Sequence, residues 1–306
     1  MVKNKNPEFT SFSDLRDSLK AGAKKGLVVA AAHDAHTLEA VFAAANEFDI
    51  SYSLVGKRSE ILRISSEMGY NPPVECIVDG EDGADCAREA VRLIREGRGH
   101  VLMKGLMETG VLLRAVVNAE TGIRAGGVMT HLAMLEVPGY HKVITITDGG
   151  MLTNPTLEQK VEIVRSVVDF YGRLGYKKPK IAALCASESV SEKIPETVDA
   201  AKLQVMCRNG ELGDCILEGP LSFDLAVSKE AAAVKGVKSE VAGDADVLLV
   251  PNITTGNVLS KGLIYWAGAK MAGCVCGAKA PIVVVSRNAT AEEKLLSVML
   301  CLRAGR

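Results

Sequence analysis

Four short polar segments in the sequence follow apolar runs that have the composition of buried β-strands. In chain order, the polar residues of interest after these runs are Lys104, Asp148, the trio Thr255-Gly256-Asn257, and the pair Ser286-Arg287. In open α/β sheets, ligands bind beyond the carboxyl ends of the strands, so chemistry is expected at such positions. Two of the segments lead into predicted helices, whose first N–H groups and partial positive charge attract anions. The residues therefore predict a site for a phosphate group or an acyl oxygen.

These segments also have a purely structural interpretation. Thr290, followed three residues later by Glu293, is the pattern of a capping box, in which both side chains satisfy N–H groups at the start of a helix. Thr255 and Asn257 are residues that often cap helices or form turns, and Arg287 has the character of a solvated surface charge. The residues alone leave both interpretations open.

Motifs of several common enzyme classes are absent. The sequence has no GxxxxGK[ST] phosphate loop and no GxGxxG after a predicted strand, which argues against ATP hydrolysis and a nicotinamide site. It also lacks the GxSxG of serine hydrolases and the HExxH of zinc proteases. The eight cysteines include no CxxC pair, so we expect free thiols and no bound metal.

The elements that must position the polar segments alternate along the chain. From Gly26 onward, short β-rich runs alternate with longer stretches of helical periodicity, which is typical of an α/β fold with mostly parallel strands. The expected strands are residues 27–31, 52–55, 74–78, 100–103, 131–137, 143–147, 181–186, 214–217, 247–250 and 282–285. The expected helices include residues 37–48, 84–96, 111–117, 157–174, 256–271 and 291–302.

Length and composition indicate a folded protein of two domains. The chain has 306 residues, 48% of them hydrophobic and 24% charged, and single cores rarely exceed about 250 residues. Its net charge of -1 supplies no field that would attract nucleic acid or an anionic membrane, so neither is an expected partner. We find neither a signal peptide nor an apolar stretch long enough to span a membrane, and we expect a cytoplasmic location.

Four runs of sequence, in this order, resemble the phosphate acetyl/butyryltransferase family, and most closely its butyryltransferase branch. They are LMKGLMETGVLLRAVVN, LEVPGYHKVITITDGG with PTLEQKVEIV, ADVLLVPNITTGNVLSKGL and PIVVVSRNATAEEKLLS. The earlier segment AAAHDAHTLEAV is also similar to the start of butyryltransferases. The resemblance implies a fold like that of isocitrate and isopropylmalate dehydrogenases, with two αβα domains and the active site in the cleft between them. Domain one would comprise residues 1–125 and 277–306, and domain two residues 126–276.

The resemblance also implies a reaction: acyl-CoA and phosphate give acyl-phosphate and CoA. Coenzyme A is then a substrate, no tightly bound cofactor or metal is needed, and a homodimer or larger homo-oligomer is expected. The butyryl group or a similar short chain is the expected acyl group. The alternatives are a phosphate acetyltransferase and a non-catalytic module that binds acyl-CoA or phosphate.

Three residues are implied in the chemical step. Ser286, or a backbone N–H at the start of a helix, would donate a hydrogen bond to the acyl carbonyl oxygen as it gains negative charge. Arg287 would lower the pKa of the attacking CoA thiol. Glu293 stands seven residues after the serine, where related acetyltransferases have an aspartate, and would be the base.

The other implied residues bind substrate. Arg114 would hold the phosphate, because its planar guanidinium matches the phosphate oxygens, and Lys104 would share that work. The remaining expected binding residues are Asp148, Thr255, Gly256 and Asn257. Gly149 stands where acetyltransferases often have cysteine, which argues against a required covalent thioester at that position.

Overall fold

The computed structural model describes residues 9–20, 24–286 and 289–306. The chain forms two compact units, each built from two separate stretches of sequence. Unit 1 comprises Met1–Phe12 and Gly127–Met271, and unit 2 comprises Ser13–Gly126 and Ala272–Arg306. The assignment of residues 1–125 with 277–306, and of residues 126–276, to separate folding domains stays a prediction.

The strands of unit 2 follow the order β3-β2-β1-β4-β11-β10. Its strands are β1 (Gly26–Ala30), β2 (Ser51–Gly56), β3 (Ile77–Asp79), β4 (Val101–Lys104), β10 (Lys270–Cys276) and β11 (Ile282–Val283). All neighbouring pairs are parallel except β10 and β11. Its helices are α1 (Phe12–Lys20), α2 (Ala35–Phe48), α3 (Arg58–Glu67), α4 (Gly83–Arg95), α5 (Thr109–Val116) and α11 (Ala291–Ala304), with a short 3₁₀ turn at Val74–Cys76.

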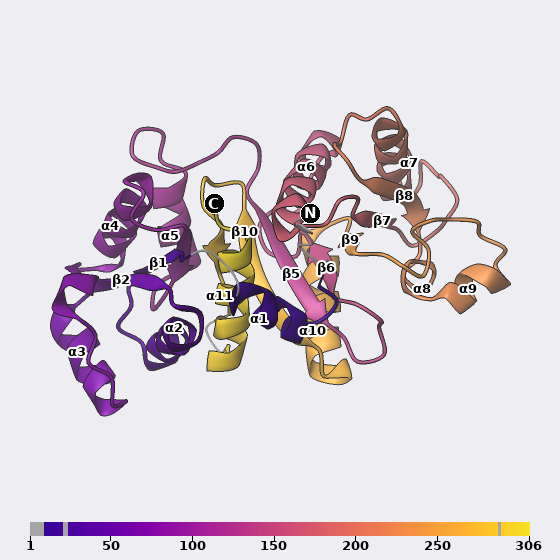
Figure 1. The fold of residues 1–306 in the computed structure, drawn as a ribbon. Coiled ribbons are helices and arrows are strands. Elements are labelled where there is room, and N and C mark those ends of the chain that lie inside the picture. The colour runs from indigo at the N-terminus through magenta and orange to yellow at the C-terminus, as the bar shows by residue number, and fades with distance from the viewer. Residues whose placement is uncertain (1–8, 21–23, 287–288) are drawn as a thin grey trace, which may run out of the picture. The chain divides into compact units, whose positions relative to one another are not determined.

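Helices cover both faces of the sheet in unit 2. Helices α2 and α11 lie on one side of β1 and β2, and α4 and α5 lie on the other (Figure 1). Every residue of β1 and β4 is buried, as the apolar runs of a doubly covered parallel sheet require. The carboxyl ends of β1, β4 and β11 are therefore neighbours at one edge of a rigid sheet.

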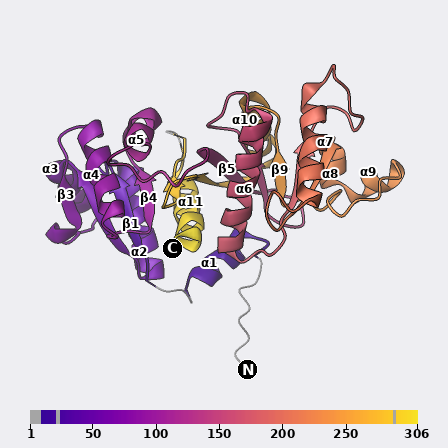
Figure 2. The same ribbon diagram turned by 90° about the horizontal axis from the view of Figure 1, so that it is seen from above.

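The strands of unit 1 follow the order β5-β6-β9-β7-β8. Its strands are β5 (Thr130–Glu136), β6 (Ile144–Thr147), β7 (Lys180–Leu184), β8 (Ile216–Leu221) and β9 (Val247–Leu249). Strand β5 is antiparallel to β6, and the other pairs are parallel. The helices are α6 (Leu157–Leu174), α7 (Pro195–Arg208), α8 (Phe223–Val227), α9 (Lys229–Val234) and α10 (Ile253–Ala267), of which α7, α8 and α9 lie together at one end (Figure 2).

The α/β class with mostly parallel strands is confirmed, and the largest error concerns residues 256–271. The helical pattern predicted one helix through this range, but α10 ends at Ala267 and strand β10 begins at Lys270. Gly268 ends the helix in a left-handed conformation with φ of 68°. The expected strand at residues 74–78 is likewise a 3₁₀ turn that leads into β3.

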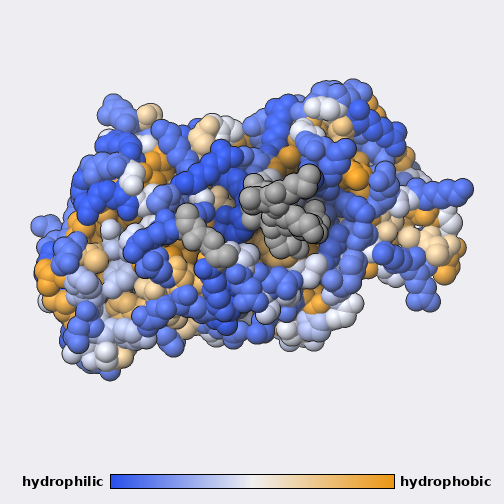
Figure 3. Space-filling model, viewed as in Figure 1, coloured by the Kyte–Doolittle hydropathy of each residue, from blue (hydrophilic) through white to orange (hydrophobic). Residues whose placement is uncertain are grey.

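Hydrophilic residues predominate on the face of the molecule in Figure 3, where hydrophobic residues are scattered. Among the residues that the structure describes, no helix combines the length and the apolar composition that a membrane span requires.

Candidate active site

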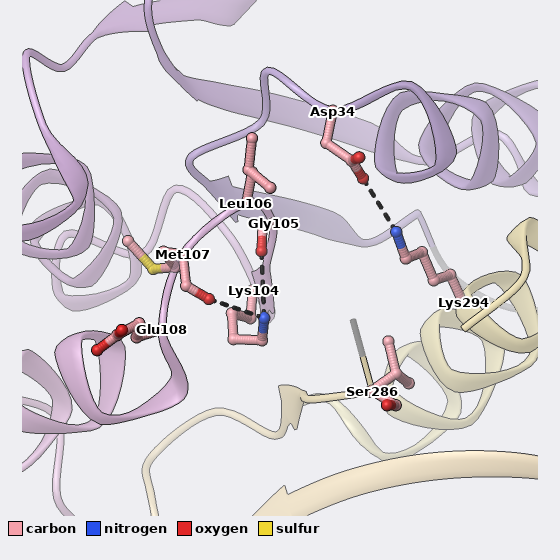
Figure 4. Close-up of a pocket in the computed structure, with 9 residues that line it drawn as sticks. Asp34, Lys104, Gly105, Leu106, Met107, Glu108, Ser286 and Lys294 are labelled. Carbon is pink, nitrogen blue, oxygen red and sulfur yellow. Dashed lines mark hydrogen bonds and ion pairs between the residues drawn. The ribbon is translucent and has the colours of Figure 1, made fainter. Parts of the chain in front are cut away.

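A pocket of about 310 Å³ lies in unit 2 at the carboxyl ends of β1, β4 and β11 (Figure 4). It is lined by the β1–α2 turn, by the loop after β4 and by the segment that leads from β11 into α11. The lining residues are Asp34, Lys104, Gly105, Leu106, Met107, Glu108, Val285, Ser286 and Lys294. Two residues expected in the site from sequence, Lys104 and Ser286, therefore share one pocket, at the sheet edge where ligands of α/β proteins bind.

Backbone contacts fix the loop after β4 against the turn after β1. The N–H of Gly105 donates to the carbonyl of Ala30 at 2.8 Å, and the N–H of Leu106 donates to the carbonyl of Ala31 at 2.8 Å. A Cβ atom on Gly105 would lie only 2.2 Å from the carbonyl oxygen of Ala31. Glycine is therefore needed for this close approach, which holds Lys104 in the pocket.

Lys104 brings a positive charge into the pocket wall although only 6% of the residue is exposed. Its Nζ donates to the carbonyls of Met107 at 3.0 Å and of Gly105 at 3.2 Å. Carbonyl oxygens partly replace the water that the ammonium loses on burial. Its ammonium group lies at the wall of the pocket, where it can also contact an anionic ligand.

A second buried lysine, Lys294, lines the same pocket and pairs with Asp34. Its Nζ lies 3.0 Å from Asp34 Oδ2 (Figure 4). It also lies 3.3 Å from Thr37 Oγ1. Asp34 also caps α2, since its Oδ2 accepts the N–H of Thr37 at 2.9 Å. Burial alone would raise the pKa of Asp34, but the hydrogen bonds from Thr37 and Lys294 outweigh it and hold that pKa below its usual value. Asp34 is therefore ionised.

Sequence reasoning missed this pair. Lys294 and Asp34 are 260 residues apart in sequence, and no local pattern joins them. One signal was present: Asp34 follows β1 at the same edge as Lys104 and stands at the start of a predicted helix. Ligands of α/β sheets bind beyond the carboxyl ends of the strands, so a search for polar residues after the expected strand 27–31 would have selected Asp34.

Glu293 forms the capping box that its spacing with Thr290 predicted. Its Oε2 accepts the N–H of Thr290 at 2.8 Å, and its own N–H donates to Thr290 Oγ1 at 3.2 Å. It is not among the described residues that line the pocket, and neither is Arg114, which is exposed on α5. Arg287 lies outside the described residues. The structural interpretation of Thr290 and Glu293 is confirmed.

Asp148, in unit 1, shapes the loop between β6 and α6. It is buried, and its carboxylate accepts three backbone N–H groups, from Gly150 at 2.8 Å, Met151 at 2.9 Å and Leu152 at 3.2 Å. Both carboxylate oxygens are thus used by the backbone. Its contacts favour a structural contribution to this loop.

The other expected residues of unit 1 form the start of α10. The cap of this helix is Asn252 and not Thr255: Asn252 accepts hydrogen bonds from the N–H and the hydroxyl of Thr255, at 3.0 and 3.1 Å, so Thr255 is held within the first turn. Gly256 packs against Gly149, since a Cβ atom on Gly256 would lie 2.6 Å from the Cα of Gly149. Asn257 is exposed inside the helix, so its interpretation as a cap or turn residue is wrong.

The unit 2 pocket combines charge and apolar surface. Lys104 and Lys294 supply buried ammonium groups, Ser286 supplies a hydroxyl, and the apolar side chains of Leu106, Met107 and Val285 line the rest. Such a mixture suits a small anion that carries a short apolar group. Among the described residues, no cluster of His, Cys, Asp and Glu has the arrangement of a metal site.

Comparisons with known proteins agree with this chemistry. Residues 81–302 match the family model "Phosphate acetyl/butaryl transferase". The chain is 38% identical to a phosphate butyryltransferase of Clostridium acetobutylicum over 95% of this chain and 96% of that protein. It is 39% identical to a phosphate acetyltransferase of Thermotoga maritima over 91% and 95% of the two chains. A branched-chain phosphotransacylase of Enterococcus faecalis has a similar structure, with a TM-score of 0.80, 31% identity, and coverage of 92% of this chain and 98% of that one. The chain therefore belongs to the phosphate acetyl/butyryl transferase family.

Proposed function

We propose that this enzyme transfers a short acyl group, butyryl or a similar chain, between coenzyme A and inorganic phosphate. The observation that carries the proposal is the unit 2 pocket, in which the buried Lys104 lies with Ser286 and apolar side chains at the edge of the sheet. Family membership supports the reaction class. The expected cytoplasmic location and the absence of a tightly bound cofactor stay predictions from the sequence.

In the proposed reaction, the sulfur of CoA attacks the carbonyl carbon of the acyl-phosphate, and the bond to the phosphate oxygen breaks. Ser286 donates to the carbonyl oxygen, which gains negative charge, and Lys104 stabilises the departing phosphate. Arg287 stays the candidate for lowering the pKa of the thiol. Arg114, Asp148, Thr255, Gly256 and Asn257 stay candidates for substrate binding.

The choice of acyl group depends on the apolar part of the pocket. Leu106, Met107 and Val285 offer surface to an alkyl chain, and each buried CH₂ contributes about 0.8 kcal/mol. The two additional CH₂ groups of butyryl would then favour it over acetyl by roughly 15-fold. The two relatives with 38% and 39% identity have different acyl groups in their names, so overall identity does not decide the preference.

The test is a phosphate-dependent CoA-release assay with acetyl-, propionyl-, butyryl- and isobutyryl-CoA. Release with a higher kcat/KM for butyryl- or isobutyryl-CoA than for acetyl-CoA is expected. A preference for acetyl-CoA would support the acetyltransferase alternative. No release with any of the four would refute the transferase and leave the non-catalytic binding module.

The role of Glu293 is tested by Glu293→Gln. A glutamine oxygen can still accept the N–H of Thr290, so the capping box and the stability should persist. If capping is its whole role, turnover should stay within about threefold of wild type, since loss of a general base typically costs a factor of about 100 or more. Steady-state kinetics with thermal unfolding checks this, and a loss of that larger size would establish Glu293 as the base.

Helix α10 supports the expected homo-oligomer. Val258, Tyr265 and Trp266 are 65%, 70% and 93% exposed, and all three belong to this one helix. Exposed aromatic groups are enriched at protein interfaces, where they bury large areas. We include self-association through this helix in the proposal.

Replacing Trp266 by glutamate should therefore shift the protein toward smaller species in sedimentation velocity, because it places a charge on the apolar face. Trp266 is the only tryptophan of the chain, so its fluorescence in the wild type should shift to longer wavelength on dilution. Val234→Glu is the matched control, since Val234 is an 82% exposed apolar residue of α9 in the same unit. Equal sedimentation of all three proteins would contradict the assignment.

A further inference from the structure

We propose that Lys294, positioned by Asp34, is an anion-binding residue of the unit 2 pocket and contacts an oxygen of the phosphate or acyl-phosphate. The inference rests on the proposed function for the identity of its ligand. It also changes which residue of the first turn of α11 is functional. The family resemblance points to the carboxylate of Glu293, whereas the geometry points to the ammonium of the next residue.

The first turn of α11 directs these two neighbouring side chains to different partners. Glu293 turns back to Thr290 and completes the cap of its own helix. Lys294 extends to the start of α2, where it meets Thr37 and the cap residue Asp34. It lines the pocket with Asp34 and Ser286 (Figure 4). Only the second side chain can meet a ligand in that pocket.

The contacts of Lys294 leave donor capacity for a ligand. An ammonium group has three N–H donors. Within the described part of the chain, Lys294 Nζ donates to Asp34 Oδ2 at 3.0 Å and to Thr37 Oγ1 at 3.3 Å. One donor therefore remains for an oxygen of a bound anion.

The charges that line the pocket favour an anion at this point. Among the lining residues that the structure describes, Asp34 and Glu108 are the carboxylates, and Lys104 and Lys294 are the cations. Glu108 is exposed, so water screens its charge, whereas both lysines are buried. Asp34 Oδ2 is shared with the N–H and the hydroxyl of Thr37, which fixes the carboxylate beside the lysine. Asp34 thus acts as a positioning residue.

Stability alone is a weak reason for such a pair. A buried ion pair often contributes little net free energy, because desolvation of both charges offsets their attraction. The chain contains a matched pair for comparison: Lys160 and Asp199 in unit 1, at 2.7 Å, with side chains 8% and 25% exposed. For Lys294 and Asp34 the values are 3.0 Å, 8% and 24%. A purely structural role predicts the same behaviour for both pairs.

The experiment compares wild type, Lys294→Met, Lys294→Arg, Asp34→Asn and Lys160→Met. Phosphorus NMR titration measures the Kd of inorganic phosphate, and steady-state kinetics measures KM for phosphate and for acyl-CoA separately. We expect Lys294→Met to raise the Kd and the KM for phosphate by about tenfold or more, a typical effect of losing a charged hydrogen bond, with KM for acyl-CoA within about threefold. Lys294→Arg should recover part of the phosphate affinity, and Asp34→Asn should weaken it in the same direction.

Lys160→Met is expected to lose about as much thermal stability as Lys294→Met and to bind phosphate like wild type. An unchanged phosphate Kd in Lys294→Met would overturn the inference, as would equal weakening in Lys160→Met or no phosphate binding by the wild type. Because the Kd is measured without turnover, the inference is tested separately from the proposed function. A wild type that binds phosphate through Lys294 but releases no CoA would refute the transferase alone.

Discussion

Replacing Lys104 by methionine should lower kcat/KM for phosphate-dependent CoA release by about 100-fold or more, the usual cost of removing one stabiliser of transition-state charge. Methionine matches the length of the lysine stem and removes only the ammonium. That ammonium is buried beside the carbonyls of Gly105 and Met107, so no water replaces it readily at the phosphate. Steady-state kinetics with butyryl-CoA and varied phosphate measures the effect.

The same substitution leaves those two carbonyls without this donor, so some loss of stability is also expected, about 1–3 kcal/mol. Urea unfolding separates this loss from the catalytic effect, provided that the assay is run where the variant is folded. Lys202→Met removes an exposed lysine of α7 and should leave kcat/KM unchanged. If Lys104→Met were folded and kept more than about a third of wild-type kcat/KM, Lys104 would have no part in phosphate stabilisation.

Local sequence patterns predicted the fold where the relevant contacts are local. Helix α6 has the predicted bounds because Thr156 and Gln159 form a capping box at its start and Gly175 ends it in a left-handed conformation. Strand β10 was missed because its small and apolar residues continue an apolar pattern that begins in α10. The antiparallel pairing of Val275 with Ile282 of β11 shows that this segment is a strand, and the helical pattern of the sequence gives no sign of that pairing.

In the candidate site, too, residues were predicted where a local pattern was sufficient and missed where their role depends on a contact distant in sequence. Lys104 and Ser286 were predicted because each follows an apolar strand run. Ligands bind beyond the carboxyl ends of such strands, so the position of a residue relative to its own strand is sufficient to select it. Lys294 was not predicted, because its function depends on Asp34, which reaches it through the packing of α11 on α2. The spacing of Glu293 fitted both a general base and a capping box, and the structure shows that its carboxylate accepts the N–H of Thr290 in the cap.

Packing gives a physical reason for glycine at position 149, where the chain departs from the family pattern. The resemblance places cysteine at this position in many acetyltransferases. In this chain, a Cβ atom on Gly149 would lie 2.9 Å from the carbonyl carbon of Gly256 and 3.2 Å from the N of Asn257. Both neighbours are backbone atoms at the start of α10, so they cannot move aside as a flexible side chain would.

Gly149→Cys should therefore destabilise the protein by about 3 kcal/mol, at the upper end of the cost of overpacking, since α10 must shift away from the β6–α6 loop. Urea unfolding measures the change. Gly172→Ala is the matched control: Gly172 is exposed in α6, a Cβ atom there meets nothing within 4 Å, and alanine should stabilise the helix by up to about 1 kcal/mol. A Gly149→Cys variant as stable as wild type would show that the β6–α6 loop and the start of α10 separate easily. If that variant also gained the mass of an acyl group with acyl-CoA, a covalent thioester would be possible at this position, and glycine in the wild type would then reflect loss of a nucleophile and not lack of space.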